Sequence, residues 1–337
     1  MKLLRKLLFP FSLLYGGITA LRNYFYNKGW FESKRYDLPV VCVGNLSTGG
    51  TGKSPMIEFL IDFLKDDYRV AVLSRGYKRT TTGFREVFQT STAEEVGDEP
   101  LQFKQNFPNI RVAVCVNRQE GIQKLKTKAD VILLDDAFQH RKVNASLKIL
   151  LTPYSDLFTR DYMLPTGNLR EFKGGARRAD IIVVTKCPKG VPYAEMQEIQ
   201  RELKPLDYQK VYFSKIGYED LIYGPSETLS LYYLQDKSFT LVTGIANPAH
   251  LVDYLEKKQF DFIHEEFPDH HNFSALDVRK LKKNEIILTT EKDYMRLQPK
   301  LGKFAIYYLP IKTLILREQG EFFKNNVSES IAKTRLS

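Results

Sequence analysis

One glycine-rich segment constrains the fold of this 337-residue chain more than any other feature. Residues 38–45 are expected to form a short buried strand, and Leu-Ser-Thr-Gly-Gly-Thr-Gly-Lys-Ser-Pro follows at positions 46–55. Apolar periodicity predicts a helix from Met56 to Leu64. A strand, a glycine-rich turn and a helix that opens on Lys-Ser form a phosphate cradle, because backbone N–H groups and the helix N-terminus point at the anion. The segment therefore predicts a nucleotide-phosphate site.

The residues of this loop have separate expected roles. Lys53 would reach the β- and γ-phosphates, and Ser54 would bind Mg²⁺. The usual pattern has Gly where this chain has Ser47, while the other glycines keep the loop flexible. The expected nucleotide-binding residues are Ser47, Thr48, Gly49, Gly50, Thr51, Gly52, Lys53 and Ser54.

A second apolar segment, residues 131–134, ends in the paired acids Asp135 and Asp136. This pattern is typical of a central parallel strand whose C-terminal edge faces the nucleotide. One of the two acids is expected to hold the Mg²⁺ shell, and adjacent acids at a solvated strand end are the plainer alternative. Further strands are expected at 69–73, 111–116, 147–151 and 179–185. Their alternation with helical stretches predicts an α/β fold with a P-loop NTPase-like parallel sheet flanked by helices.

The base of the nucleotide is indicated by a segment after a late strand, Thr185-Lys186-Cys187-Pro188. Guanine-specific proteins of this class have [NT]-K-x-D here, and the Asp is missing. ATP is therefore favoured over GTP.

Charge and cysteine content restrict the environment and the partners. A formal net charge of +10 favours anionic partners such as nucleic acid, a membrane surface or a phosphorylated substrate, and the charge alone does not choose among them. The 3 cysteines cannot all pair and lack the spacing of metal ligands. We therefore expect a reducing compartment and neither a disulfide framework nor a zinc module.

Residues 1–28 combine cations with an apolar run from Leu7 to Leu21. The run is shorter than the roughly 20 residues that span a bilayer, and Pro10 and the Gly16-Gly17 pair are expected to break it. An amphipathic segment in the headgroup region is expected. A helix packed on the protein's own core is the alternative, and a secretory signal peptide is disfavoured because no clear cleavage site follows.

Seven segments in order resemble the tetraacyldisaccharide 4′-kinases, the lipid A 4′-kinases of Gram-negative bacteria. The resemblance covers most of the chain, and the atypical Ser47 is also found in this family. The segments that carry it are Gly44-Asn-Leu-Ser-Thr-Gly-Gly-Thr-Gly-Lys-Ser-Pro55, Leu73-Ser-Arg-Gly-Tyr77, Val96-Gly-Asp-Glu-Pro100, Asp135-Asp-Ala-Phe-Gln-His140, Leu164-Pro-Thr-Gly-Asn-Leu-Arg-Glu171, Phe267-Pro-Asp-His270 and Thr289-Thr-Glu-Lys-Asp293.

The resemblance implies transfer of the γ-phosphate of ATP to the 4′-hydroxyl of a tetraacylated glucosamine disaccharide 1-phosphate, which gives lipid IVA. It also implies work at the cytoplasmic face of the bacterial inner membrane, with peripheral attachment through residues 1–28 to an anionic surface. ATP and Mg²⁺ are the expected cofactors. Neither a nucleic-acid partner nor an obligate protein partner is expected.

The resemblance also implies catalytic roles for Asp98 and His270, and the neighbouring residues suggest two further candidates. Asp98, in a loop before a helix, would receive the proton of the sugar hydroxyl, and His270 would support it; a helix cap and a structural histidine are the alternatives. Glu99 would orient substrate or support the metal, or else be a first-turn acid that answers the helix dipole. Arg118 would clamp phosphate charge in a bidentate way, or be a surface cation.

Four further residues are weaker candidates for substrate or phosphate contact. Arg75 follows the second strand, His140 follows the paired acids, and Arg170 and Glu171 follow a Pro-Gly turn. A structural ion pair or a loop hydrogen bond would explain each of them as well.

We expect three parts: a membrane-interface segment at 1–28, a P-loop kinase domain at 29–208, and a smaller C-terminal α/β domain at 209–337. Segments 211–218 and 304–311 are expected to pair as a two-stranded connector that lets the domains hinge. The polar motif Glu291-Lys292-Asp293 is either a helix cap or a nucleotide or hinge contact.

Two other functions compete with the kinase. One is a P-loop ligase or metallochaperone with a soluble substrate, which would not need residues 1–28. The other is a basic binding protein that uses ATP as a switch, but aromatic residues and cations do not interleave in the pattern of a nucleic-acid site.

Overall fold

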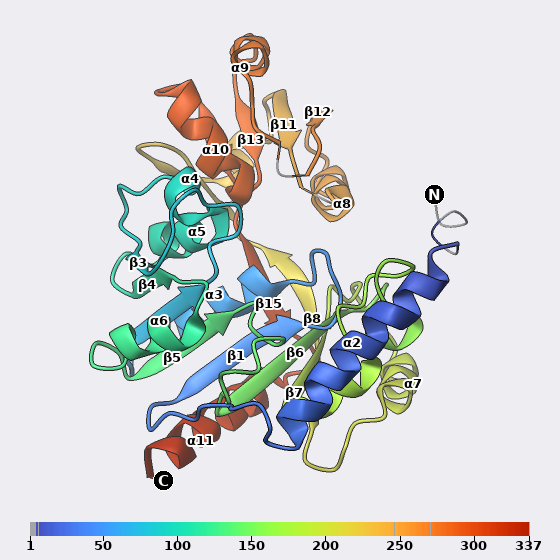
Figure 1. Ribbon diagram of the computed structural model, residues 1–337. Coiled ribbons are helices and arrows are strands. Elements are labelled where there is room, and N and C mark those ends of the chain that lie inside the picture. Colours follow the sequence, from blue (N-terminus) through green and yellow to red (C-terminus); the bar gives the residue numbers. More distant parts are fainter. Residues whose placement is uncertain (1–4, 6, 246, 270, 337) are drawn as a thin grey trace.

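The computed structural model describes residues 5, 7–245, 247–269 and 271–336, and its main feature is a nine-stranded sheet (Figure 1). The strand order is β15-β8-β7-β6-β1-β5-β2-β4-β3. The strands are β1 Val40–Asn45, β2 Val70–Ser74, β3 Arg85–Glu86, β4 Arg111–Val114, β5 Val131–Asp135, β6 Leu147–Pro153, β7 Ile181–Thr185, β8 Lys210–Tyr218 and β15 Ile311–Ile315.

The central strands are parallel and buried. β1 lies between β5 and β6, with Val43 opposite Asp135 and Ile149. Only the outermost strands β3 and β15 pair antiparallel with their neighbours among the described strands of this sheet. Since parallel strands end at the same edge, the phosphate loop after β1 and the acids after β5 meet there. The predicted α/β class with a parallel sheet is confirmed.

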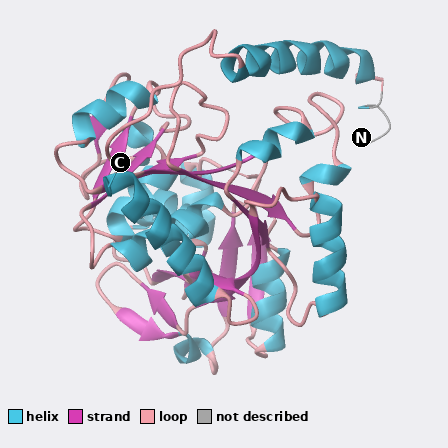
Figure 2. Ribbon diagram, turned by 90° about the horizontal axis from the view of Figure 1, so that it is seen from below, coloured by secondary structure: helices cyan, strands magenta, loops and turns pink. Residues whose placement is uncertain are grey.

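Helices cover both faces of this sheet, as Figure 2 shows from below. On one face, α3 and α11 pack with Met56, Phe323 and Val327 in one core cluster. On the other face, α6 and α7 contribute Ile122 and Met196 to a second cluster. The helices of this part are α3 Lys53–Leu64, α4 Ala93–Val96, α5 Asp98–Asn106, α6 Arg118–Leu125, α7 Tyr193–Leu203 and α11 Gly320–Leu336, with the short 3-10 helices Phe158–Arg160 and Lys173–Arg178.

A second sheet of six strands, in the order β10-β9-β14-β13-β11-β12, forms a smaller α/β unit above the first (Figure 1). Its own core includes Leu241, Leu288 and Tyr307. Its elements are β9 Leu221–Tyr223, β10 Thr228–Ser230, the 3-10 helix Leu231–Leu234, β11 Phe239–Thr243, α8 Ala249–Lys257, β12 Phe262–Glu266, α9 Ala275–Leu281, β13 Ile287–Thr289, α10 Glu291–Leu301 and β14 Ile306–Tyr308.

An antiparallel pair of strands connects the two units, but its second strand differs from the prediction. β8 pairs with β15, with Tyr218 opposite Ile311, whereas residues 306–308 form β14 inside the second sheet. The expected strand 304–311 was wrong because it spans two strands of different sheets, separated at Leu309-Pro310, where proline has no N–H to donate.

The chain returns to the large unit after β15, since Phe323, Val327 and Ile331 of α11 lie in its core. We therefore propose the small domain as residues 219–309, with both connector strands and α11 assigned to the large domain. The division expected from the sequence, at 29–208 and 209–337, instead places the connector strands and α11 with the small domain, and it stays a prediction.

The N-terminal helix α2 (Phe9–Asn27) lies on the outside of the large domain (Figure 1). The expected breaks in it were wrong. Pro10 stands at its first turn, where the missing N–H costs no hydrogen bond, and Gly16 gives room to Phe172, whose ring would lie 2.7 Å from an added Cβ. Along the described chain, we find no helix with the length and apolar character that a membrane span requires.

Candidate active site

The phosphate loop is held in shape from several sides. Gly49 and Gly52 adopt φ of 105° and 90°, which residues with a side chain rarely adopt. Asn45 Nδ2 donates to Thr51 Oγ1 at 2.7 Å, and Thr185 Oγ1 donates to the Thr51 carbonyl at 2.8 Å. The loop is therefore preorganised, with the N-terminus of α3 behind it.

A second loop braces the first part of this cradle. The N–H of Thr48 donates to the carbonyl of Asn168 at 2.8 Å, and Ser47 forms an isolated bridge with Leu169. Gly50 lies beside Lys186, since the Nζ atom would be 3.7 Å from an added Cβ.

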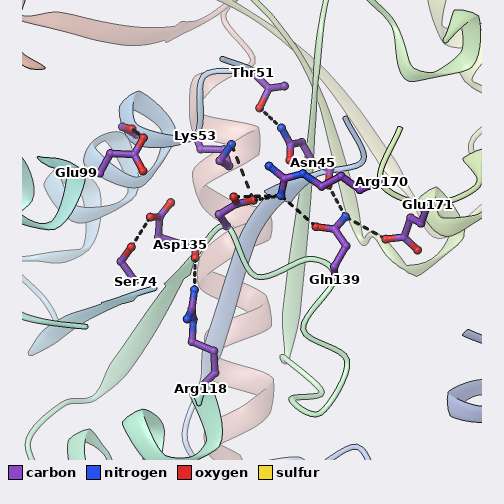
Figure 3. A network of polar contacts seen from close by, with 12 residues as sticks. Asn45, Thr51, Lys53, Ser74, Glu99, Arg118, Asp135, Gln139, Arg170 and Glu171 are labelled. Carbon is purple, nitrogen blue, oxygen red and sulfur yellow. Dashed lines mark hydrogen bonds and ion pairs between the residues drawn. The ribbon is translucent and has the colours of Figure 1, made fainter. Parts of the chain in front are cut away.

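The paired acids stand at the end of β5, where Figure 3 shows Asp135 in contact with Ser74 and Arg118. Asp135 is 1% exposed and accepts a hydrogen bond from Ser74 Oγ at 2.8 Å. Burial, aided by the charges of Glu99 and Asp136, raises the pKa of Asp135 to about 7. Its Oδ1 atom is buried and has no hydrogen-bond partner among the described residues.

Asp136 is held by two cations. It adopts φ of 46° and accepts from Arg170 Nη1 at 3.0 and 3.1 Å. Lys53 Nζ lies 3.9 Å from its Oδ1 atom. Asp136 thus joins the phosphate-loop lysine to the loop that carries Arg170.

Glu99 lies opposite, in the first turn of α5. Its Oε1 atom accepts from Ser54 Oγ and from Lys292 Nζ, both at 2.9 Å. Burial alone would raise the pKa of Glu99, but the charges of Lys292 and Lys53 and the two hydrogen bonds lower it to about 2. Glu99 is therefore an anion at the edge of the cradle.

Asp98 is the first residue of α5. The expected position in the loop before this helix was wrong. It forms a two-pronged ion pair with Arg296 of α10, whose Nε donates to Asp98 Oδ1 at 3.1 Å. Asp98 directly precedes Glu99, and both acids lie in the first turn of α5. His270, its expected partner, lies outside the described residues.

Arg118 lies below the acids and is 2% exposed, so the alternative of a surface cation was wrong. Its guanidinium donates to the carbonyls of Cys115 at 2.7 Å and Asp135 at 3.2 Å. Burial lowers the pKa of Arg118. These contacts hold the ends of β4 and β5 together, and a role in clamping phosphate stays a prediction.

The weaker candidates differ in their surroundings. Arg170 reaches Asp136, while Glu171 forms an ion pair with Arg178 at 2.7 Å and accepts from Asn23 of α2 at 2.9 Å. Burial, with nearby cations, lowers the pKa of His140 to about 4. Arg75 is exposed after β2.

Sequence reasoning missed Arg296 and left the contacts of Lys186 and Lys292 open. Lys186 follows β7 with φ of 57°, and burial lowers its pKa, as do the charges of Lys292 and Lys53. Their signals were the Thr-Lys pair at a strand end and the polar Glu-Lys-Asp motif. Neither signal identifies which distant residue the cation meets.

The fold and the cradle define a P-loop nucleotide-binding protein with a second domain beside the site. The family model for tetraacyldisaccharide-1-P 4′-kinase matches residues 4–331. The chain belongs to the tetraacyldisaccharide 4′-kinase family.

Individual relatives agree with this assignment. The chain is 49% identical over 328 residues to the tetraacyldisaccharide 4′-kinase of Flavobacterium johnsoniae, with 96% of each chain covered. It is 46% identical to that of Flavobacterium psychrophilum, with 97% of each covered. A crystal structure of LpxK from Aquifex aeolicus, described as the "apo" form in complex with ATP, matches with a TM-score of 0.80 and 32% identity, over 97% of this chain and 99% of that one.

Proposed function

We propose that this chain transfers the γ-phosphate of ATP to the 4′-hydroxyl of tetraacyldisaccharide 1-phosphate and so forms lipid IVA in lipid A biosynthesis. The observation that carries this proposal is the family match over residues 4–331, together with a phosphate loop that faces paired acids. ATP is the donor, and the acylated glucosamine disaccharide 1-phosphate is the acceptor.

The phosphate loop would bind the triphosphate and stabilise the charge that develops on it. Backbone N–H groups from residues 47–54 and the N-terminus of α3 favour an anion at this place. Lys53 would neutralise the γ-phosphate, and Arg170 would add a planar guanidinium at the rim. Phosphoryl transfer needs mainly alignment and such charge stabilisation.

Asp98 would accept the proton of the acceptor hydroxyl. The Arg296 guanidinium favours its ionised form and orients both carboxylate oxygens. Support from His270 stays part of this proposal.

The donor set fits Mg²⁺, which usually binds to one or two carboxylates, substrate phosphates and water. The Oδ1 atom of Asp135 is buried and has no hydrogen-bond partner among the described residues, so it would suit such an ion. Asp135, Asp136 and Ser54, with Glu99 beside them, would hold it. The bound ion would neutralise phosphate charge.

The helix α2 would attach the enzyme to the cytoplasmic face of the inner membrane. Leu13, Leu14, Ile18 and Leu21 are each more than half exposed on it, although moving apolar side chains out of water lowers the free energy. An acceptor with four acyl chains stays in the bilayer, so the kinase must work within reach of the headgroups.

The test is transfer of labelled γ-phosphate from ATP to tetraacyldisaccharide 1-phosphate in detergent micelles with Mg²⁺. Lys53→Ala should lower turnover about 100-fold or more, because a positioned charge on the transferring phosphate is lost. Lys65→Ala, at the exposed end of the same helix, is the matched control. Absence of product from the wild-type chain, while ATP still binds, would refute the assigned acceptor.

A further inference from the structure

The first turns of α10 place two cations of the small domain against acids of the large domain. Lys292 Nζ donates to Glu99 Oε1 at 2.9 Å, and Arg296 pairs with Asp98. Figure 1 shows α10 beside α5, which carries both acids. The partners are 193 and 198 residues apart in the chain. The two domains therefore meet through opposite charges at the edge of the phosphate cradle.

Lys292 is connected to the phosphate loop itself. Glu99 Oε1 accepts from Lys292 and also from Ser54, the second residue of α3. Burial alone would lower the pKa of Lys292, but the charge of Glu99 and the hydrogen bond to it raise this pKa, with help from Asp135. A continuous polar path thus runs from the small domain through Glu99 to Ser54.

The rest of the motif that contains Lys292 has a structural role. Thr290 caps α10, and Asp293 Oδ2 accepts from the Gly244 N–H at 2.8 Å and from Thr290 Oγ1 at 2.7 Å. These contacts stay inside the small domain. Helix capping therefore explains the contacts of Thr290 and Asp293, but it does not explain why the Lys292 side chain contacts Glu99 of the large domain.

We propose that Lys292 is a positioning residue for phosphoryl transfer, which through its ion pair with Glu99 holds the small domain against the phosphate loop and orients the Glu99 carboxylate toward Ser54. This inference rests on the proposed function for its kinetic consequences. Arg296 acts on Asp98 in the same way. Binding of the triphosphate is thereby coupled to the position of the small domain, since both depend on the charges around Glu99.

The test compares Lys292→Met, Lys292→Arg, Glu99→Gln and the double variant Lys292→Met/Glu99→Gln in the full chain. Lys283→Met, an exposed lysine of the same domain, is the matched control. The measurements are kcat and KM for ATP, the Kd for ATP by calorimetry, and the radius of gyration by small-angle X-ray scattering with and without ATP. Thermal unfolding shows whether each variant folds.

Loss of a coupling contact should lower kcat/KM for ATP about 5- to 150-fold in Lys292→Met. Lys292→Arg should recover part of this loss, because it keeps the charge. The double variant should be no worse than Glu99→Gln, since both changes break one ion pair. The radius of gyration of Lys292→Met should exceed that of the control and respond less to ATP.

Two results would overturn the inference. One is a Lys292→Met variant with the kinetics and the scattering of Lys283→Met. The other is a double variant whose loss equals the product of the single losses, because the two residues would then act independently. If Lys292→Met does not fold, Lys292→Arg and Glu99→Gln decide by the same criteria.

Failure of the proposed function has a different signature. If the wild-type chain does not phosphorylate the disaccharide, the ATP affinity and the scattering still test Lys292. Weaker ATP binding and a larger radius in Lys292→Met would then support the positioning role alone.

Discussion

Two acids of the site illustrate how neighbours decide the charge of a buried carboxylate. Burial raises the pKa of Asp135 to about 7, whereas Lys292 and Lys53 overcome burial and lower the pKa of Glu99 to about 2. The two side chains differ by one methylene group, so their surroundings account for the difference. Glu99 is therefore anionic at neutral pH, whereas the charge of Asp135 depends on the groups around it.

Asp98→Asn is the residue-scale prediction. The carboxamide fits the same space but cannot accept a proton, so turnover should fall about 100- to 10,000-fold. Measured by calorimetry, the affinity for ATP should change much less.

Glu94→Gln, an exposed acid in the preceding helix, is the control and should match the wild-type chain. An Asp98→Asn variant that turns over like the wild-type chain would show that another group receives the proton.

The helix α2 has two faces with different surroundings. One face is tied to the large domain, where Ser12 Oγ donates to the Met163 carbonyl at 3.1 Å and Tyr15 donates to the Arg170 carbonyl at 3.0 Å. The other face exposes Leu14 and Ile18, at 65% and 61%. Since Arg170 is also a site residue, α2 connects the proposed membrane surface to the edge of the active site.

The element-scale prediction changes the exposed face alone. The triple variant Leu14→Ser/Ile18→Ser/Leu21→Ser should bind vesicles of anionic phospholipid at least about tenfold more weakly, because each buried leucine or isoleucine contributes about 1.5–3 kcal/mol. Vesicle co-sedimentation measures this change.

Leu276→Ser, a more exposed leucine on α9 in the small domain, is the control. Equal sedimentation of the triple variant and the control would contradict membrane binding through α2.

The interface between the domains contains two buried acids that share one amide. Gln102 Nε2 donates to Glu58 of α3 and to Glu291 of α10, each at 2.9 Å, and Asn106 donates to Glu58 at 3.0 Å. Burial and the charge of Glu291 raise the pKa of Glu58 well above its usual value, so the protonated form of Glu58 is favoured. Burial also raises the pKa of Glu291 to about 7. The contact between domains therefore prefers a protonated acid.

The prediction at the scale of the molecule concerns stability and pH. The pKa of Glu291 is about 7 in the folded state and about 4.5 in the unfolded state. Its contribution to stability is therefore fully present below pH 4.5 and is lost as the pH rises through 7. Glu291→Gln removes this titration and keeps an amide oxygen for Gln102. Relative to the wild-type chain, the variant should therefore gain up to about 3 kcal/mol of unfolding free energy between pH 5 and pH 8.

Urea unfolding at the two pH values measures this difference. Glu285→Gln, an exposed acid just before β13, is the control. If the difference in unfolding free energy between the variant and the wild-type chain does not depend on pH, Glu291 has the same charge in the folded and the unfolded state.

The amino-acid sequence by itself determined the local parts of this protein. The phosphate loop, the paired acids after β5 and the parallel sheet all follow from short patterns, because periodicity and turn chemistry act over a few residues. Family membership rests on the order of such patterns, and Ser47 belongs to that order.

Only the tertiary structure decided which distant groups meet. Nothing near Asp98, Glu99 or Glu58 in the chain indicates that Arg296, Lys292 and Glu291 of α10 face them. The same holds for β15 and α11, which return to the large domain after the small one. Such contacts depend on how two separately formed cores dock, and the docking surface combines residues whose spacing along the chain has no regular relation to their distance in space.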